Sequence, residues 1–178
     1  NGLCQVQPVH ATTVGAVAES LQSFAAARPA LHIADVGTGF LRALYATYIS
    51  YLPPDAFSYA ITRHEDPRGV FMEMLKTPGA GQFSVFTAHP GVTRGGHYHH
   101  TKSEKFLVVK GVARFRFRNM ADGQTHELVV HGEDGRIVDT APGWAHDITN
   151  IGEDELVVML WANEIFDRQH PDTVASKV

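Results

Sequence analysis

The N-terminal part of the chain carries apolar residues at helical spacing. They recur every three or four positions over residues 12–30 and again over 38–54, which gives each segment one apolar face. Thr12 or Thr13 is suited to cap the first helix, and a pair of prolines ends the second. Two helices with apolar faces and no core of their own must pack against another part of the protein. A further domain would provide that surface.

From about residue 57 the pattern changes to short strands separated by turn-forming residues. The stretch "ARFRFRN" alternates strictly, with Phe115 and Phe117 on one face and three arginines on the other, as in a half-buried strand. Eight such strands are expected, over residues 69–77, 82–89, 105–111, 112–120, 125–132, 136–143, 145–152 and 155–166. Strands joined by tight turns without intervening helices predict a mainly β jelly-roll sandwich or barrel. We therefore divide the chain into a helical segment, 1–52, and a β domain, 53–178.

Composition and charge exclude several classes of protein. The net charge of −4 offers no basic field for nucleic acid or an anionic membrane. No apolar run is long enough to span a bilayer, and the N-terminus lacks the features of a signal peptide. Cys4 is the single cysteine, so no disulfide can form within the chain, which fits the cytoplasm. The first residue is not methionine, so we expect the chain to be a piece of a longer protein.

The stretch "TRGGHYHHTKSEKFLVVKG", residues 93–111, contains three histidines, a glutamate and three lysines. His97 and His99 are two residues apart, so on a strand both imidazoles point to the same face. A turn over residues 100–103 then returns the chain and brings Glu104, at the head of the next strand, across from the pair. Two neutral imidazoles and one carboxylate suit zinc, iron or manganese.

A fourth ligand should come from another strand that faces the same interior. His146, in "APGWAHDITN", is the best-placed histidine because it follows a Pro-Gly turn and begins an alternating strand. The alternative interpretation of these four residues is a polar barrel mouth without metal. Their convergence from two separate stretches favours a metal site.

Both stretches resemble the two sequence motifs of the cupin family. The first motif is matched at Gly91, His97, His99, Glu104 and Gly111, and the second at Gly143, His146 and Asn150. The one departure is Ala141, where the family has a proline, and it changes a turn rather than a ligand. The resemblance implies a mainly β cupin (RmlC-like) fold, a double-stranded β-helix or jelly-roll barrel, preceded here by an N-terminal helical segment.

A narrower resemblance covers nearly the whole chain. Residues 46–77, 94–111 and 159–173 are similar to the bifunctional UDP-sugar epimerase/reductases of capsule and O-antigen synthesis, the CapF/WbjC family. That family joins a short-chain reductase domain to a C-terminal cupin, so the segment 1–52 is expected to be the tail of a reductase domain.

This resemblance implies an activity, a metal and a partner. The cupin would epimerise C3 of a UDP-2-acetamido-2,6-dideoxy-4-hexulose, and the reductase would then reduce C4 with NADPH on the route to UDP-N-acetyl-L-fucosamine. The chain has no glycine-rich dinucleotide loop, so no NADPH site is expected in it. Zinc in the cupin and a homodimer formed through the cupin are also implied.

The proton chemistry leaves a choice of residues. Because C3 lies next to the C4 ketone, its proton is acidified, and removal needs a base and a group that holds the oxyanion. A metal-bound imidazole cannot accept a proton at its ligating nitrogen. If all four ligands hold a metal, the base lies elsewhere, and Lys102, Lys105 and His100 are the candidates. For each lysine the alternative is a solvated surface charge.

Further candidate contacts surround the metal motif. The stretch "DPRGVFMEMLK" resembles the arm of the metal-free dTDP-4-keto-6-deoxyhexose 3,5-epimerases, which implies that Arg68, Phe71 and Glu73 hold the nucleotide. In the same comparison His97 stands where those enzymes carry their catalytic base. Arg94 could bind pyrophosphate or be a charge at the rim, and Trp144 would line the cavity.

Two alternative functions come from other classes. The cupin could be a non-catalytic dimerisation module that zinc only braces, or an unrelated iron-dependent cupin dioxygenase. Fold alone does not decide between them, because cupins carry many chemistries.

Overall fold

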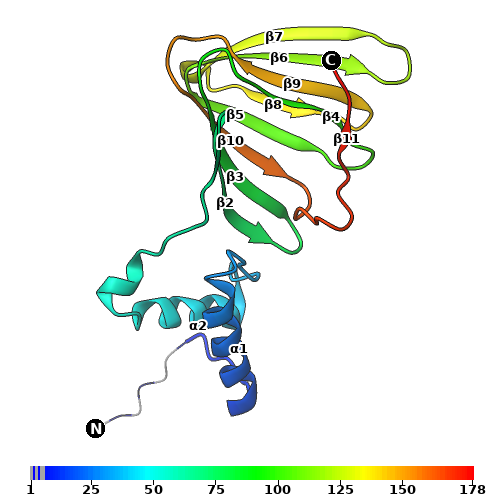
Figure 1. Cartoon of the computed structure of the whole chain (residues 1–178). Helices are drawn as coiled ribbons and strands as arrows, with labels where there is room; N and C mark the ends of the chain where they lie inside the picture. The colour runs from blue at the N-terminus through cyan, green and yellow to red at the C-terminus, as the bar shows by residue number, and fades with distance from the viewer. Residues whose placement is uncertain (1, 3, 5–6) are drawn as a thin grey trace. The chain divides into compact units, whose positions relative to one another are not determined.

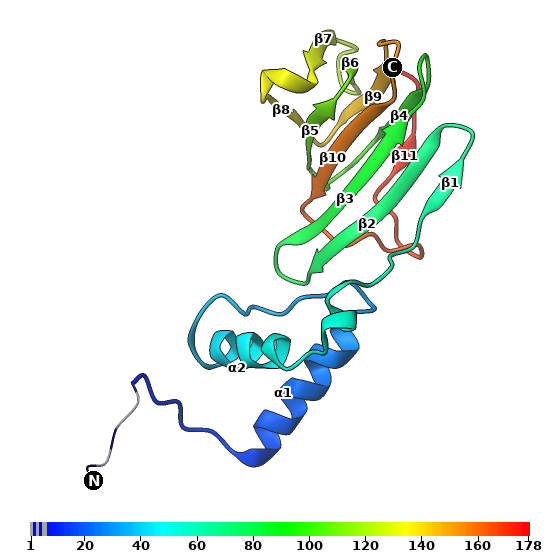
Figure 2. The same cartoon turned by 90° about the vertical axis from the view of Figure 1, so that its left-hand side faces the viewer.

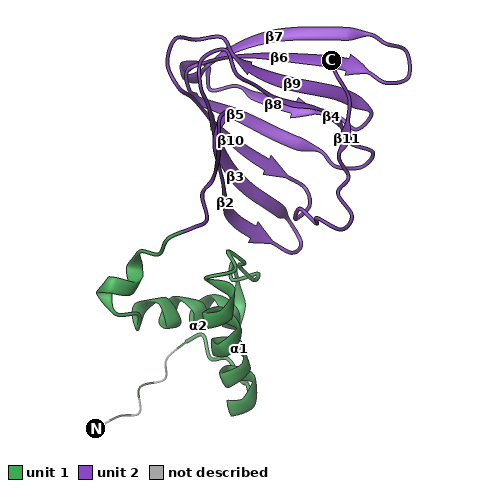
Figure 3. Ribbon diagram, viewed as in Figure 1, with its two compact units in different colours: residues 1–60 green, residues 61–178 purple. Residues whose placement is uncertain are grey.

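The structure, a computed structural model, describes residues 2, 4 and 7–178. It divides into two compact units, Asn1–Ala60 and Ile61–Val178, coloured green and purple in Figure 3. The helical unit thus includes the short 3-10 helix η1 (Pro54–Phe57) after the expected helical segment. The origin of the helical unit as the tail of a reductase domain stays a prediction.

The helical unit consists of α1 (Val14–Ala27), α2 (Gly39–Ser50) and η1. Thr13 caps α1, because its Oγ1 accepts a hydrogen bond from the Ala16 N–H at 3.1 Å. The one buried side chain of the two described α-helices is Phe24, whose ring lies 5.1 Å from that of Tyr45 and 5.8 Å from that of Tyr48. No helix in the described part of the chain is long and apolar enough to cross a membrane.

The β unit is built from two antiparallel sheets, seen in two orientations in Figures 1 and 2. The six-stranded sheet has the order β1-β2-β3-β10-β5-β8. Its strands are β1 (His64–Asp66), β2 (Gly69–Thr77), β3 (Gly81–Ala88), β10 (Leu156–Ala162), β5 (Glu104–Lys110) and β8 (Ile137–Thr140). The five-stranded sheet has the order β11-β4-β9-β6-β7. Its strands are β11 (Val174–Ala175), β4 (Thr93–Tyr98), β9 (Trp144–Asn150), β6 (Val112–Asn119) and β7 (Thr125–His131).

The hydrophobic core lies where the inner faces of the two sheets meet. Inward residues alternate with outward ones along each strand, as in β6, where Phe115 and Phe117 are buried. The ring of Phe106 in the six-stranded sheet lies 5.8 Å from that of Phe115 in the five-stranded sheet. The predicted mainly β jelly-roll with an N-terminal helical segment is confirmed, and the expected strands correspond to β2, β3 and β5–β10.

Two short edge strands were not expected from the pattern of residues. β1 pairs with β2, and β11, which lies near the C-terminus, pairs with β4. Strands of three and two residues are too short to show an alternation. The position of β11 matters for the site, because it joins the C-terminal segment to the histidine-bearing strand.

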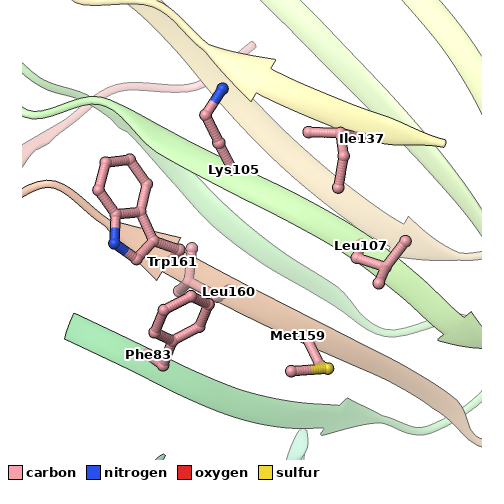
Figure 4. Close-up of a pocket in the computed structure, with 7 residues that line it drawn as sticks. All are labelled: Phe83, Lys105, Leu107, Ile137, Met159, Leu160 and Trp161. Carbon is pink, nitrogen blue, oxygen red and sulfur yellow. The ribbon is translucent and has the colours of Figure 1, made fainter. Parts of the chain in front are cut away.

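The outer face of the six-stranded sheet carries an apolar groove of about 340 Å³. Figure 4 shows its lining, which consists of Phe83, Lys105, Leu107, Ile137, Met159, Leu160 and Trp161. Ile137 is 53% exposed and Phe83 is 38% exposed. Outward apolar side chains from four neighbouring strands therefore form a continuous apolar surface at this face.

Candidate metal centre and cavity

Three strands bring one glutamate and three histidines together between the sheets. His97 lies in β4 and His99 directly follows that strand, while Glu104 begins β5 and His146 lies in β9. His97 and His146 are directly paired across the two neighbouring strands. The strand alternation inferred from the sequence therefore brings the four residues together, as expected from their spacing.

A glycine bulge precedes the histidine pair. The pairing of β4 with β9 shifts register between Gly95 and His97, and Gly95 has a φ of +91°. A Cβ atom on Gly95 would lie 2.9 Å from the carbonyl oxygen of His146. Glycine is therefore required for β4 to approach β9 this closely just before the site.

The four side chains form a compact cluster. Their candidate ligand atoms all lie within 4.8 Å of one another. The Nε2 atoms of His99 and His146 each lie 3.2 Å from the same oxygen of Glu104, Oε2. The ring of His97 lies 4.9 Å from the ring of His99 and 4.8 Å from the ring of His146, measured between centroids.

The geometry and chemistry of this cluster fit a divalent metal. His99, Glu104 and His146 are at most 8% exposed. Among the described residues, Nε2 of His146 is buried and has no hydrogen-bond partner, because its contact with Glu104 is close but poorly directed. A buried imidazole nitrogen without a partner is costly, and a metal ion would satisfy it. The cluster could therefore hold a metal through three imidazoles and one carboxylate.

The electrostatic environment keeps His97 and Glu104 in forms that suit a metal. Burial lowers the pKa of His97 to about 4, and the neighbouring His146 acts in the same direction. Burial would raise the pKa of Glu104, but the imidazoles of His146 and His99 outweigh it and hold this pKa well below its usual range. Burial also opposes the charged form of His99, yet Glu104 and a backbone carbonyl raise the pKa of His99 overall. Metal ligands must be deprotonated, and a neutral His97 with an ionised Glu104 meets that need.

Backbone carbonyls orient two of the imidazoles. His99 Nδ1 donates a hydrogen bond to the carbonyl oxygen of Asp172, and His146 Nδ1 lies 3.2 Å from the carbonyl oxygen of Trp144. An Nδ1–H that donates to a carbonyl leaves Nε2 as the free ligand atom. Both rings therefore present Nε2 to the centre of the cluster.

A cavity of about 540 Å³ opens beside the cluster. The ligands His97, His99 and Glu104 line part of it. The rest of its lining consists of His64, Glu65, Asp66, Arg68, Phe71, Gln82, Ser84, Arg94, Lys102, Leu160, Ala162, Glu164, Phe166 and Thr173. The cluster of histidines and glutamate thus opens onto a space large enough for a small molecule.

The three candidate proton carriers lie in different environments. Lys102 lines the cavity and is only 4% exposed, with Nζ 3.4 Å from a carboxylate oxygen of Glu164. Lys105 points to the outer face of β5, where it forms an ion pair with Asp139. His100 is exposed and is not part of the cavity lining. Only Lys102 is therefore brought together with the metal cluster.

The candidate substrate contacts are divided in a similar way. Arg68, Phe71 and Arg94 line the cavity. Glu73 does not line it but accepts a hydrogen bond at 3.2 Å from the amide of Gln82, which does. Trp144 lines a separate pocket of about 330 Å³, so it is not brought to this cavity.

Arg94 is held at one end and free at the other. Its Nε donates a hydrogen bond at 2.8 Å to the Thr87 carbonyl, and its guanidinium lies 5.4 Å from the ring centroid of Phe86. Desolvation lowers the pKa of Arg94, and its buried Nη2 has no partner among the described residues. A fixed arginine with an unsatisfied nitrogen beside a cavity is suited to bind an anion.

Some residues at the cavity were not expected from the sequence. Gln82 and Ser84 are buried polar residues on the inner face of β3, and their alternation in "QFSVF" was a usable signal. Glu164 and Thr173, together with Asp172 beside His99, come from the irregular segment after β10, which has no period. Their positions depend on tertiary contacts that no local pattern reveals.

Comparison with known proteins gives a consistent result. Residues 64–174 match the family model described as the polysaccharide biosynthesis C-terminal domain. The chain is 60% identical over 174 residues to a Pseudomonas aeruginosa protein named UDP-2-acetamido-2,6-beta-L-arabino-hexul-4-ose reductase, covering 98% of this chain and 47% of that one.

Solved structures show the same relationship. The capsular polysaccharide assembling protein CapF of Staphylococcus aureus superposes with a TM-score of 0.90 at 41% identity, covering 93% of this chain and 45% of that one. A structure of CapF with the inhibitor 3-isopropenyl-tropolone gives a TM-score of 0.93 at 41% identity, covering 100% of this chain and 51% of that one. The chain thus spans about half the length of these relatives.

More distant structures bear on the fold alone. The oxalate decarboxylase of Lactobacillus farciminis superposes with a TM-score of 0.53 at 16% identity, covering 65% of this chain and 33% of that one. Together with CapF, this neighbour confirms the predicted cupin fold.

Proposed function

The chain belongs to the family of polysaccharide biosynthesis C-terminal domains, and we propose that it epimerises C3 of a UDP-2-acetamido-2,6-dideoxy-4-hexulose. The name of the Pseudomonas relative, a reductase of a UDP-2-acetamido-hexul-4-ose, supports this substrate class at 60% identity. Reduction of C4 with NADPH would follow in a reductase domain of the longer protein, in a route to UDP-N-acetyl-L-fucosamine and capsular polysaccharide.

One observation carries the proposal. A buried amine, Lys102, and a cluster of four potential metal ligands face the same cavity. Epimerisation next to a ketone needs a group that moves the C3 proton and a positive centre near the oxygen that gains charge. Lys102 would move the proton, and a divalent metal held by the cluster would be the positive centre.

Zinc is the proposed metal, held by His97, His99, Glu104 and His146. Three imidazoles and one carboxylate are within its ligand preferences, although iron and manganese accept the same set. A bound divalent metal would supply Lewis acidity to the oxygen that becomes an oxyanion.

Lys102 is the proposed carrier of the C3 proton. In its neutral form Nζ takes the proton as the C3–H bond breaks, and in its charged form it can return a proton to C3. Glu164 forms an ion pair with Nζ at 3.4 Å. Lys105 and His100 do not line the cavity, so they are weaker candidates for this role.

The proposed nucleotide contacts are Arg68, Phe71 and Arg94. The two guanidinium groups suit the pyrophosphate of UDP, and the ring of Phe71 offers an apolar contact. Glu73 does not line the cavity, and its proposed role is to orient the side chain of Gln82, which does. Trp144 lies in another pocket and is not included in the proposed site.

The decisive experiment measures deuterium exchange at C3. The chain, loaded with zinc, is incubated with the UDP-4-keto sugar in D₂O without NADPH, and NMR follows replacement of the C3 proton. We expect exchange by the unaltered chain. We also expect Lys102→Met to lose about 100-fold or more in rate, the scale of a lost general base.

Lys105→Met is the matched control, since it removes an amine three residues away that points to the outer face. It should exchange at the unaltered rate. If the zinc-loaded chain exchanges no deuterium, the epimerase proposal fails for this chain. Equal rates for both variants would remove Lys102 from the mechanism.

We also propose that the chain forms a homodimer through the β unit and acts in the cytoplasm. The proposed occupant of the apolar groove on the outer face of the six-stranded sheet is a second copy of the chain. Apolar side chains that are exposed singly are common on monomers, whereas those of the groove form one continuous surface. Ile137→Glu should then shift sedimentation toward monomer, whereas Val129→Glu, on a strand of the other sheet, should not. A monomeric unaltered chain would contradict the dimer.

A further inference from the structure

The C-terminal segment lies against the loop that carries the metal ligands. Figures 1 and 2 show β11, drawn in red, beside β4, and the register pairs Ala175 with His97. Further along, the Ser176 N–H donates to the Gly96 carbonyl at 2.9 Å. The guanidinium of Arg118 also holds this segment, through the Ser176 hydroxyl at 2.9 Å. The segment is therefore anchored on the histidine-bearing strand.

Just before β11, the Asp172 carboxylate binds three consecutive backbone N–H groups. It accepts hydrogen bonds from His100 at 2.8 Å, Thr101 at 2.7 Å and Lys102 at 2.8 Å, and another from the Thr101 hydroxyl at 3.0 Å. Three successive N–H groups that point to one anion form a backbone nest. These three residues connect His99 to the strand of Glu104, so the carboxylate fixes the loop between two potential ligands.

The backbone of the same residue contacts one of those ligands. The Asp172 carbonyl oxygen accepts the hydrogen bond from His99 Nδ1. The carboxylate holds Asp172 against the 100–102 loop, and this contact fixes the position of the carbonyl oxygen of the same residue. The next residue, Thr173, lies with its hydroxyl 3.5 Å from Nζ of Lys102.

From these contacts we propose that Asp172 is a positioning residue, which fixes the imidazole of His99 with Nδ1 protonated and Nε2 directed at the metal cluster. It acts through His99 and the 100–102 loop and does not itself touch a metal or a substrate. The proposal deepens the proposed metal site and rests on it.

A purely structural role for Asp172 predicts different results. A turn cap would affect the stability of the fold but would leave the ring of His99 and the affinity for metal unchanged in a folded variant. A positioning residue changes the metal affinity and the state of the His99 ring even when the fold is intact. Partners that orient metal-bound histidines typically change metal affinity by about 10- to 100-fold when they are removed.

The test compares Asp172→Ala and Asp172→Asn with Asp167→Ala in the full chain. Asp167 is a matched control, because it lies in the same C-terminal segment and its carboxylate also accepts a backbone N–H, that of Gln169 at 2.8 Å. Zinc affinity is measured by competition with a chromophoric chelator at fixed pH. We expect Asp172→Ala to bind zinc at least about tenfold more weakly and Asp167→Ala to bind it unchanged.

A second readout needs no metal. In the metal-free protein, at a pH above the raised pKa of His99, the ¹⁵N shifts of the His99 ring report which nitrogen carries the proton. The unaltered chain should show protonated Nδ1, and Asp172→Ala should show a mixture of tautomers. Asp172→Asn keeps the size of the side chain and one acceptor oxygen, so it should fold and fall between the other two in both measurements.

The outcomes separate the two levels of the argument. If the unaltered chain binds no zinc, the proposed metal site fails, while the ring shifts still decide whether Asp172 orients His99. If the unaltered chain binds zinc and folded Asp172→Ala and Asp172→Asn variants bind it equally well with unchanged ring shifts, the positioning role is overturned.

Discussion

Replacement of His146 by alanine tests the metal cluster most directly. His146 is 4% exposed, and its Nε2 has no hydrogen-bond partner in the described part of the chain. A ligand that binds only the folded state adds about 2.7 kcal/mol of stability when its free concentration is 100 times its dissociation constant. For a chain of this size, 1 kcal/mol corresponds to about 2–4 °C in the unfolding temperature. Zinc should therefore raise the unfolding temperature of the unaltered chain by about 5–11 °C.

The variant should lose most of this increment. Loss of one of four ligands weakens zinc binding by about 100-fold or more, since even outer partners contribute 10- to 100-fold. The same free zinc would then be near the dissociation constant and add only about 0.4 kcal/mol, or 1–2 °C. His146→Ala also removes packing beside Phe117, whose ring centroid lies 6.5 Å away, so its metal-free unfolding temperature falls as well. The difference between the two increments removes that packing cost from the comparison.

The assay is thermal unfolding followed by circular dichroism, with free zinc set by a metal buffer. Two controls address adventitious binding. His170→Ala removes an exposed histidine, and Cys4→Ser removes an exposed thiol. Both controls should keep the full increment, together with one zinc per chain by elemental analysis. If His146→Ala keeps an increment equal to that of the unaltered chain, the four-ligand cluster is not the zinc site.

Three further predictions concern the surroundings of the site. Gly95→Ala should destabilise the chain by about 1–3 kcal/mol in urea unfolding, because φ is +91° and the new Cβ would meet backbone at 2.9 Å; Gly79→Ala, with nothing within 4 Å, should change little. Arg116→Met should cost about 2 kcal/mol by the same measurement, because it leaves the buried carboxylate of Asp147 without its charged partner. The cost is less than for a fully buried pair because the Arg116 side chain is 37% exposed. Unchanged stability would show that this ion pair adds nothing. Arg94→Met should weaken UDP binding by about tenfold or more in calorimetry, as expected for a lost charge-assisted hydrogen bond; unchanged affinity would remove Arg94 from the nucleotide site.

The sequence predicted the convergence of His97, His99, Glu104 and His146, because the strand period and the turns between strands are visible in it. His99 lies two positions after His97, and a strand has a period of two, so both rings must share a face. The same period also places Lys105 opposite to Glu104, so its outward direction was available from the pattern. Lys102 lies in a turn, where no period applies, and its burial depends on residues that follow β10.

Other contacts could not have been found in this way. Asp172 lies about 70 residues after the loop that it binds. β11, which brings it there, has only two residues, so no alternation marks it as a strand. Trp144 begins β9 two residues before His146, so the strand period puts both side chains on one face, but Trp144 lines a separate pocket that no local pattern distinguishes from the cavity.

The arrangement also bears on the conflict between a metal ligand and a base at His97. If His97 holds a metal, the proton must be carried by another group, and the cavity contains the buried amine of Lys102 for that purpose. A metal that only braces the fold would leave exchange at C3 dependent on Lys102 but insensitive to which metal is bound. A metal that stabilises the oxyanion acts in the same step as the lysine, so the losses in Lys102→Met and His146→Ala would not add independently. The exchange rate of the double variant, compared with the rates of the two single variants, therefore distinguishes a structural metal from a catalytic one.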